Sequence, residues 1–564
     1  MHAASDPRLT LGRFLRDVCE AQRGRRALVF EGRELGYDEV EAQSLALARA
    51  MLGAGVVKGS RVALCMGNRP EWIAACFAAG MLGAVLVPVN TFATRAERDY
   101  VLRHGDASLL LLQRELRSQH FLSELCADHP EIAGGVPGRL RCAALPQLRR
   151  VACLDLAAPQ GGVEAWPDFL AHASDVPAAL VAACCDEVEP AEDALIVYTS
   201  GSTAEPKAVL HTQRTLALQA RRYVDFLRLE RDDVIFTTYP FFWTAGIAMS
   251  LGGSFAAGAT LVVQQAFDPA EGIALIERLR VSVLHAWPHQ QRALAEQPGL
   301  AGRDLRALRK LDFSSPLARQ AGIREDRYGY GASYGLSETC TFATALPADA
   351  PAAARRESHG VPNPGMEFRI LDPESGEALP PGRPGEIALR GVALMRGYHK
   401  LPREAAFDAD GFFRTRDGGW LDAEGRLHWT GRLSNLLKTG GANVSPLEIE
   451  RVLEKFPGLK AGVAVGVPHP TLGEAIVLCA VPQDGVSLAA EPLQAFLREQ
   501  LAAYKRPRAV LFFSAAELSY TANQKIQVGP LRELAAARLA RDGVVIEGHR
   551  YGAQPDALAA RSRA

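Results

Sequence analysis

The sequence predicts an α/β fold with at least two domains, and three observations support this. The chain has 564 residues, more than one hydrophobic core usually serves. Short apolar runs rich in β-branched residues alternate with amphipathic segments over most of its length. The runs are apolar throughout rather than alternating, which is typical of largely parallel sheets with helices on both faces.

The elements follow in order along the chain. Residues 38–55 predict a helix, because apolar positions recur every three or four residues and Gly53 and Gly55 supply a stop. Six apolar runs predict buried strands: 61–66, 84–89, 108–113, 194–199, 260–265 and 281–286. Residues 143–190 show few periodic runs, and we expect a loose connection there.

Residues 72–94 carry no charge and are long enough to suggest a membrane span. Gly80, Gly83 and Pro88 interrupt the stretch, and its composition changes from Ala-rich to β-branched. We therefore predict a buried helix followed by a buried strand.

The sequence pattern changes after residue 362, where turn-forming residues become frequent. Turn signals every eight to twelve residues predict antiparallel β structure, with a turn at Asp422–Gly425. Further on, 445–456 and 491–504 predict helices and 461–468 a strand. A small α+β domain beginning near residue 434 follows from this pattern.

Composition and charge narrow the class of function. Hydrophobic residues make up 48% of the chain, and 63 basic residues balance 64 acidic ones. This balance gives no electrostatic footprint for nucleic acid or an anionic membrane and favours a small-molecule enzyme. The ten cysteines are scattered, and the N-terminus has no apolar signal region, so we expect a reducing, cytoplasmic location.

The stretch YTSGSTAEPKAVLHT (198–212) follows an apolar strand and precedes the helix-like segment RTLALQARRYVDFL. A loop from strand to helix is a place where backbone amides and a helix N-terminus can bind phosphate. It is not a Walker A loop, because Pro206 stands where that motif has its second Gly. Taken alone, the segment is either a phosphate-binding loop or a Ser/Thr-rich turn.

Four further motifs decide between these readings: SYGLSE (333–338), TRDGGWLDAEG (415–425), GRLSNLLKTGGANVSPLEIE (431–450) and SYTANQKIQ (519–527). Because these motifs follow YTSGSTAEPK in this order and at this approximate spacing, the chain resembles the adenylate-forming superfamily. That superfamily comprises acyl- and aryl-CoA synthetases, firefly-type luciferases and peptide-synthetase adenylation domains. Residues 35–90 also resemble its N-terminal subdomain. The resemblance implies a large N-terminal domain (1–432) of stacked mixed α/β subdomains plus a β-rich subdomain. A small mobile C-terminal α+β domain (433–564) would follow.

The resemblance also implies an ATP site. Its residues would be Thr199, Ser200, Gly201, Ser202, Thr203, Lys207, Tyr334, Ser337, Glu338, Asp417 and Arg432. Lys207 would neutralise the β/γ-phosphates, and Glu338 would offer a hard oxygen ligand for Mg²⁺. Tyr334 would stack on adenine, Asp417 would accept hydrogen bonds from the ribose hydroxyls, and Arg432 would reach the ribose and phosphate edge.

The same resemblance assigns the C-terminal residues. Lys525 would reach the attacking carboxylate and the α-phosphate as the adenylation lysine. Ser434 would be the hinge of a domain rotation. Lys438, Gly440 and Gly441 would then approach the active site in the thiol step.

The segment PFFWTAG (240–246) resembles the acyl-pocket segment, with Trp243 replacing the usual His and Gly246 at its end. A large ring there favours an apolar or aromatic acyl group. The chain departs from the family pattern at Ala204, Ala208, Gln213, Arg416 and Gln524, and in the Ser314–Ser315–Pro316 turn.

We expect an AMP-forming acyl-CoA synthetase that uses ATP, Mg²⁺ and CoA and activates a fatty or aryl acid through an acyl-adenylate. Two alternatives stay open. One is an acyl-AMP ligase or amide synthetase that passes the adenylate to a carrier-protein pantetheine or an amine, and the other is a degenerate nucleotide- or acyl-binding relative without turnover. A homodimer is compatible with the sequence, whereas we expect no nucleic-acid partner and no transmembrane segment.

Overall fold

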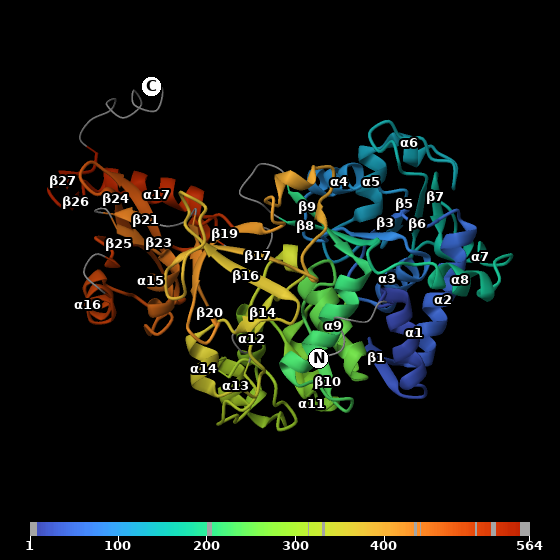
Figure 1. Ribbon diagram of the computed structural model, residues 1–564, viewed down its shortest axis with the longest axis horizontal. Coiled ribbons are helices and arrows are strands. Elements are labelled where there is room, and N and C mark those ends of the chain that lie inside the picture. Colours follow the sequence, from blue (N-terminus) through green and yellow to red (C-terminus); the bar gives the residue numbers. More distant parts are fainter. Residues whose placement is uncertain are drawn as a thin grey trace. The chain divides into compact units, whose positions relative to one another are not determined.

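The computed structural model describes residues 8–199, 206–313, 315–329, 333–433, 437–439, 442–501, 505–520 and 526–552, with only the backbone at 442 and 443. It has the mixed α/β architecture that the sequence predicts (Figure 1). Its contacts divide it into two compact units. Unit 1 comprises Met1–Arg369, Ala388–Arg414 and Leu421–His428, and unit 2 comprises Ile370–Ile387, Thr415–Trp420 and Trp429–Ala564. The predicted domain boundary after Arg432 stays a prediction.

An eight-stranded sheet is the first layer of unit 1. Its strands, in spatial order, are β18 (Gly397–Tyr398), β9 (Lys207–Thr212), β8 (Asp193–Thr199), β4 (Val85–Pro88), β3 (Arg61–Cys65), β5 (Leu109–Leu112), β6 (Arg150–Cys153) and β7 (Val163–Ala165). The strands from β8 to β7 are parallel, whereas β9 and β18 join antiparallel at one edge.

Side chains along each strand alternate between two cores. In β5, Leu109 and Leu111 belong to one hydrophobic cluster, and Leu110 and Leu112 to another. The first cluster includes α2 (Tyr37–Gly53) and α3 (Pro70–Leu82), and the second includes α4 (Arg95–His104) and α5 (Phe121–Asp128). Figure 1 shows the helices on both sides of the sheet. Burial on both faces explains why these strands read as unbroken apolar runs.

A five-stranded sheet lies on the other side of the first cluster. Its spatial order is β12 (Val283–His285), β10 (Val234–Thr237), β11 (Thr260–Val263), β1 (Arg26–Phe30) and β2 (Arg33–Gly36). Leu28, Ile235 and Leu261 share a cluster with α3, whereas Val29, Phe236 and Val262 face a third cluster. Unit 1 is therefore a stack in which helices separate two sheets.

The other helices of unit 1 complete these layers. They are α1 (Leu11–Ala21), α6 (Pro130–Ala133), α7 (Trp166–Ala171), α8 (Ala178–Asp186), α9 (Gln213–Leu227), α10 (Gly253–Ala257), α11 (Pro269–Arg278), α12 (Pro288–Ala295), α13 (Pro316–Gln320), α14 (Ala352–Glu357), the π-helix η2 (Ala245–Gly252) and the 3₁₀ turns η3 (Leu300–Gly302), η4 (Ser337–Thr339) and η5 (Arg403–Ala405). A small sheet joins β13 (Ser333–Tyr334), β14 (Thr344–Ala345) and β15 (Val361–Pro362).

The charge-free stretch 72–94 is a buried helix and strand, as predicted. Helix α3 ends at Gly83, which adopts φ 63°, and β4 follows at the centre of the sheet. No helix in the described ranges has the length and apolar character needed to cross a membrane.

The prediction for residues 143–190 is wrong. This segment forms β6, β7, α7 and α8, and the two strands complete one edge of the large sheet. The strands have only 4 and 3 residues and the helices 6 and 9. Elements this short repeat too few positions for a hydrophobic period to be visible.

Unit 2 is a three-layer α/β body with one sheet between helices. Its sheet joins β22 (Ala442–Val444), β21 (Leu437–Thr439), β24 (Gly473–Pro482), β23 (Leu459–His469) and β25 (Ala509–Phe512). One face packs on α17 (Val528–Arg541), and the other on α15 (Pro446–Leu453) and α16 (Ala490–Gln500). The turn η8 (Ala515–Glu517) and the pair β26 (Val545–Ile546) and β27 (His549–Arg550) complete it. A further sheet has the order β16 (Met366–Leu371), β17 (Gly385–Gly391), β19 (Phe413–Leu421) and β20 (Leu427–Arg432).

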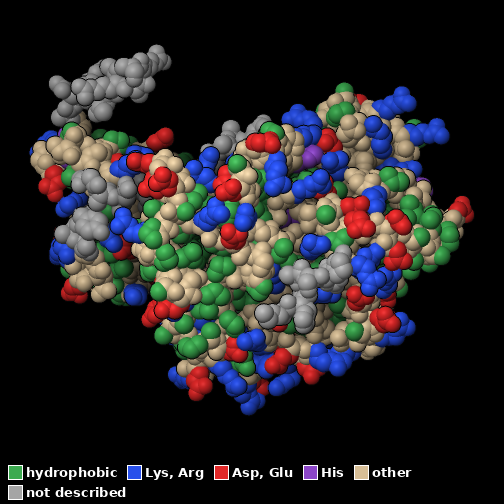
Figure 2. All heavy atoms as spheres, in the orientation of Figure 1, with side chains coloured by type: hydrophobic (Ala, Val, Ile, Leu, Met, Phe, Trp, Pro, Cys, Tyr) green, Lys and Arg blue, Asp and Glu red, His purple; other side chains and the backbone are tan. Residues whose placement is uncertain are grey.

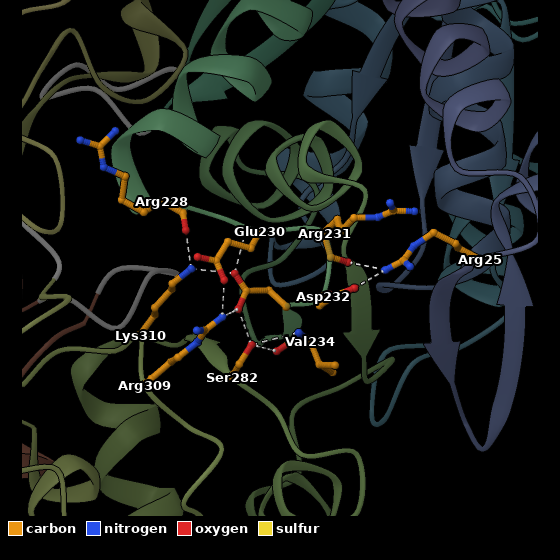
Figure 3. Close-up of polar contacts among 10 residues, drawn as sticks. Arg25, Arg228, Glu230, Arg231, Asp232, Val234, Ser282, Arg309 and Lys310 are labelled. Carbon is orange, nitrogen blue, oxygen red and sulfur yellow. Dashed lines mark hydrogen bonds and ion pairs between the residues drawn. The ribbon is translucent and has the colours of Figure 1, made fainter.

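A buried ionic cluster supports the five-stranded sheet (Figure 3). The Asp233 carboxylate accepts hydrogen bonds from Lys310 Nζ at 2.7 Å, Arg309 Nη2 at 2.6 Å and Ser282 Oγ at 2.7 Å. The side chains of Asp233 and Lys310 are both 0% exposed. On the surface, by contrast, basic and acidic side chains are interspersed on the face shown in Figure 2, as the near-zero net charge predicts.

Candidate active site

The stretch 198–212 is a β-hairpin. Strands β8 and β9 pair antiparallel, with Thr199 opposite Lys207 and Tyr198 opposite Ala208. The predicted strand-to-helix connection is therefore wrong, because α9 begins only at Gln213. No helix N-terminus directly follows β9 at Lys207, so the predicted phosphate-binding groups of this stretch are hydroxyls, backbone amides and Lys207, without a helix N-terminus. Ser200, Gly201, Ser202, Thr203 and Ala204 lie outside the described residues.

The hairpin explains why position 208 does not need Gly. Ala208 lies within β9, and its carbonyl accepts a hydrogen bond from the His399 N–H at 2.8 Å. Its φ is not positive, and extended backbone is available to any residue. The substitution of Ala for the family's Gly at this position is therefore compatible with the fold.

A tyrosine joins the hairpin to the SYGLSE motif. The Lys207 ammonium lies 5.0 Å from the centre of the Tyr398 ring, and the Tyr398 hydroxyl donates to Glu338 Oε1 at 2.8 Å. Tyr398 is 8% exposed, so its position is set by packing. One buried side chain thus orients both a cation and a carboxylate that the sequence predicts to be catalytic.

The turn after Glu338 is strained. Cys340 has φ 49° and Thr341 has φ 96°, a region that a β-branched residue rarely adopts. Such residues cost about 1–3 kcal/mol each and are often found at functional sites. A Cβ at Gly335 would lie 1.6 Å from the Thr341 carbonyl oxygen, so only Gly can stand there.

Gln219 and His211 hold this strained turn, and the sequence analysis missed both. The Gln219 amide nitrogen lies within hydrogen-bond distance of the carbonyls of Thr339 (2.9 Å), Cys340 (3.2 Å) and Phe342 (2.9 Å). His211 Nε2 donates to the Ser337 carbonyl at 2.7 Å. Burial lowers the pKa of His211 to about 4 although this hydrogen bond opposes the shift, so the ring is neutral at pH 7. Both side chains are 0% exposed, but neighbouring polar residues in β9 and α9 hide this from the sequence.

The other described residues of SYGLSE belong to the same assembly. Tyr334 is 6% exposed, its N–H donates to Thr344 Oγ1 at 3.0 Å, and its ring meets Phe368 edge-on at 6.4 Å. The ring is thus fixed by packing, and its stacking on adenine stays a prediction. Across the described ranges, no three His, Cys, Asp or Glu side chains gather as a metal site.

Two predicted ATP-site residues pair in unit 2. Asp417 is 2% exposed, and its Oδ1 lies 2.9 Å from Arg432 Nε. Arg416, which stands where the family has Gly, adopts φ 60°. The position thus keeps the left-handed backbone that suits Gly.

Of the remaining predicted C-terminal residues, only Lys438 lies within the described ranges. Lys438 is exposed on β21, and its N–H donates to Glu474 Oε2 at 2.8 Å. Ser434, Gly440, Gly441, Gln524 and Lys525 lie outside the described residues.

The acyl-pocket segment follows β10. Trp243 is half-buried, with the rings of Phe242 and Phe92 at 5.0 and 6.2 Å. A Cβ at Gly246 would lie 2.0 Å from the Pro240 carbonyl oxygen, so this backbone approach requires Gly. After β12, Trp287 packs on Tyr239 with ring centres 4.3 Å apart. The carboxyl ends of two neighbouring parallel strands therefore carry aromatic side chains.

Comparison with known protein families shows to which family the chain belongs. The model of the AMP-binding enzyme family matches residues 15–399, and that of the AMP-binding enzyme C-terminal domain matches residues 448–525. The chain belongs to the AMP-binding enzyme family.

This AMP-binding enzyme has similar relatives over nearly its full length. It is 32% identical over 521 residues to the indoleacetate–CoA ligase of Aromatoleum aromaticum, covering 91% of this chain and 96% of that one. It is 31% identical to the feruloyl-CoA synthase of Amycolatopsis sp., covering 89% and 94% of the two chains. Its fold matches the crystal structure of ATP-bound MatB from Rhodopseudomonas palustris with TM-score 0.75 and 26% identity, over 93% and 98% of the two chains. The predictions of the adenylate-forming superfamily and of an AMP-forming acid–thiol ligase are confirmed.

Proposed function

We propose that this AMP-binding enzyme activates an apolar, preferably aromatic, carboxylic acid with ATP and transfers the acyl group to CoA. In the first step a carboxylate oxygen attacks the α-phosphorus, and pyrophosphate leaves. In the second step the CoA thiol attacks the acyl carbon, and AMP leaves. The observation that carries the proposal is the Lys207–Tyr398–Glu338 arrangement, which links the two motifs nearest the phosphates.

The charges of this arrangement suit the first step. The leaving pyrophosphate develops negative charge, which the half-buried Lys207 can neutralise without reorganising. Glu338 supplies one carboxylate, and one or two carboxylates plus substrate phosphates are the usual ligands of a nucleotide-bound Mg²⁺. The residues therefore fit Mg²⁺, which would neutralise phosphate charge when bound. Thr199 to Thr203 would add further donors to the phosphates.

The other roles are carried over from the family resemblance. Asp417 would accept from the ribose hydroxyls, with Arg432 beside it. Lys525 would serve the adenylation step, Ser434 the domain rotation, and Lys438, Gly440 and Gly441 the thiol step.

Two observations support an aromatic acid. The segments after β10 and β12 carry Trp243, Tyr239 and Trp287, and aromatic side chains beside the acyl group would suit a flat apolar acid. The similar relatives named above act, by their names, on indoleacetate and on ferulate.

Pyrophosphate release over a panel of acids tests the proposal. Indole-3-acetate, ferulate, benzoate, octanoate and acetate are each supplied with ATP and Mg²⁺, with and without CoA, and the products are separated chromatographically. We expect release with the aryl acids and a CoA thioester only when CoA is present. Acid-dependent release without thioester would instead indicate a carrier-protein or amine acceptor, and no release with any acid would indicate a degenerate binding protein.

Two variants at Tyr398 test whether the Lys207–Tyr398–Glu338 arrangement contributes to ATP activation. Tyr398→Phe keeps the ring beneath Lys207 and removes only the hydroxyl that orients Glu338, whereas Tyr398→Leu removes both contacts. We expect pyrophosphate release to fall in both variants and further in Tyr398→Leu. Wild-type rates in both would remove the basis of the proposal.

A further inference from the structure

Three side chains outside the predicted site hold the two ends of the hairpin loop. Tyr198 precedes Thr199 on β8, and Pro206 precedes Lys207 on β9. Helix α4, more than 90 residues earlier in the chain, supplies a contact to each end through Tyr100 and His104. Tyr100 and His104 lie outside the motifs that identify the family, and Tyr198 is the residue just before the first predicted ATP-site residue, Thr199.

We propose that Tyr100, His104 and Tyr198 are positioning residues for ATP activation, which hold Thr199 and Lys207 in register at the phosphate end of the hairpin. The inference rests on the proposed function, because it assigns these residues a role in the adenylation step. They act through Thr199 and Lys207 rather than by touching the substrate.

The contact at the β8 end is a directed hydrogen bond. The Tyr198 hydroxyl lies 2.9 Å from His104 Nδ1. Burial raises the pKa of Tyr198 well above its usual value, and the neighbouring Tyr100 and Asp106 raise it further. The phenol therefore keeps its proton, and it can donate this proton to His104 Nδ1 when the neutral imidazole carries its hydrogen on Nε2.

The contact at the β9 end comes from the same face of α4. The Tyr100 hydroxyl donates to the Pro206 carbonyl at 3.4 Å. Tyr100 and His104 are four residues apart, so their side chains are neighbours on the helix, and their rings stack with centres 5.1 Å apart. One helical turn thus spans the distance between the two strand ends.

The backbone permits the close approach. A Cβ at Gly105, the residue after His104, would lie 3.2 Å from the Tyr198 hydroxyl oxygen and 2.7 Å from the Val101 carbonyl oxygen. A larger residue would displace either the helix end or the tyrosine. The absence of a side chain at position 105 therefore brings α4 against β8.

Further polar residues surround His104 on its other sides. The His399 ring meets it edge-on at 5.5 Å, and His399 Nε2 lies 3.3 Å from Asp106 Oδ2. Asp106 also accepts from Lys400 Nζ at 2.8 Å. The backbone N–H of His399 donates to the Ala208 carbonyl, so this side of the cluster also ties to β9.

The geometry explains why the hairpin needs such support. Thr199 and Lys207 are the last described pair of the ladder between β8 and β9, and pairs near the end of a ladder open more readily than central ones. Side-chain hydrogen bonds just before Thr199 and just before Lys207 oppose that opening. Lys207 then keeps its place over Tyr398.

A double-mutant cycle tests the inference. Tyr198→Phe removes one hydroxyl, and His104→Ala removes its acceptor. Each should lower kcat/KM for ATP in acid-dependent pyrophosphate release about fivefold, the effect of one hydrogen bond. The double variant should lose no more than about fivefold, because both changes break the same bond. Conversion of a supplied acyl-adenylate to thioester should be unchanged.

Two further variants separate positioning from general stability. Tyr37→Phe is the matched control, since its hydroxyl is also buried and donates to the Ala259 carbonyl at 2.7 Å. It should lower the melting temperature as Tyr198→Phe does but leave kcat/KM for ATP unchanged. His104→Gln keeps a hydrogen-bond acceptor for the Tyr198 hydroxyl, so it should restore most of the activity that His104→Ala loses.

The possible outcomes are distinguishable. If the wild type releases no pyrophosphate with any acid, the proposed function and this inference both fail. If the wild type is active but Tyr198→Phe matches it, or Tyr37→Phe loses as much kcat/KM as Tyr198→Phe, the positioning role is refuted and the proposed function stands.

Discussion

Replacing Lys310 with Met should destabilise the protein strongly, because it leaves a buried carboxylate short of its partner. Lys310 Nζ and Asp233 Oδ2 are 2.7 Å apart, and neither side chain is exposed to solvent. Met has a similar length and no charge, so the change removes the ammonium and little packing. Breaking a buried pair on one side costs about 3–5 kcal/mol. Arg309 and Ser282 still contact Asp233, which places the expected loss near the lower end, at about 3 kcal/mol.

Arg309→Met is the matched control in the same cluster (Figure 3). Arg309 also binds Asp233, at 2.6 Å, but its side chain is 41% exposed. Water screens an exposed pair, so we expect a loss below about 1 kcal/mol. The two variants therefore remove the same kind of contact from the same carboxylate and differ in burial.

Calorimetric melting distinguishes the two variants. For the roughly 400 residues of unit 1, about 3 kcal/mol corresponds to a decrease of about 3–4 °C in its melting temperature. Arg309→Met should lower it by about 1 °C or less. Equal shifts in both variants, or no shift in Lys310→Met, would refute the reasoning from burial.

The contribution of the Asp233–Lys310 pair to stability should also depend on pH, in a direction that follows from the pKa of Asp233. Burial opposes ionisation of Asp233, but hydrogen bonds from Lys310, Arg309 and Ser282 outweigh it and hold its pKa below the usual value. Its contribution to stability is therefore complete above the unfolded pKa of about 3.9 and is lost as the pH falls through the folded pKa. The melting difference between wild type and Lys310→Met should be largest near pH 7 and narrow in acid.

Three other predictions concern the site. The Arg416→Gly variant should be about 1 kcal/mol more stable than the Arg416→Ala variant, because both lose the long side chain but only Gly adopts a positive φ without strain. Equal melting temperatures of the two variants would contradict this. Tyr398→Phe should lower kcat/KM for pyrophosphate release about tenfold, the effect of one hydrogen bond to a carboxylate, and wild-type kinetics would argue against a role for that bond. Lys525→Ala should reduce adenylation by orders of magnitude and leave thioester formation from a supplied acyl-adenylate largely intact, whereas equal loss of both steps would remove its assigned role.

The buried strands and long helices could be predicted because they repeat a pattern. The six apolar runs from 61–66 to 281–286 all contain strands, and residues 38–55 contain α2. Their period and their burial come from the same cause, contact with helices on both faces. The short elements between 143 and 190 were missed because three to nine residues do not establish a period.

The hairpin at 198–212 shows how tertiary context overrides a local pattern. The sequence places KAVLHT in a loop between a strand and a helix, yet it is strand β9, with His211 and Ala208 buried. What makes it a strand is its pairing to β8 on one side and β18 on the other. Neither partner is visible within the segment itself.

By itself the sequence determined the α/β class and the membership of a family, because these depend on composition and on motifs in a given order, and it predicts the residue types of a phosphate site. Tertiary structure alone decided how those residues are held. Tyr398 joins Lys207 to Glu338, Gln219 secures the strained turn, and Lys310 neutralises Asp233. Each contact joins residues at least 60 positions apart, and such pairs come together only when the layers of the fold assemble.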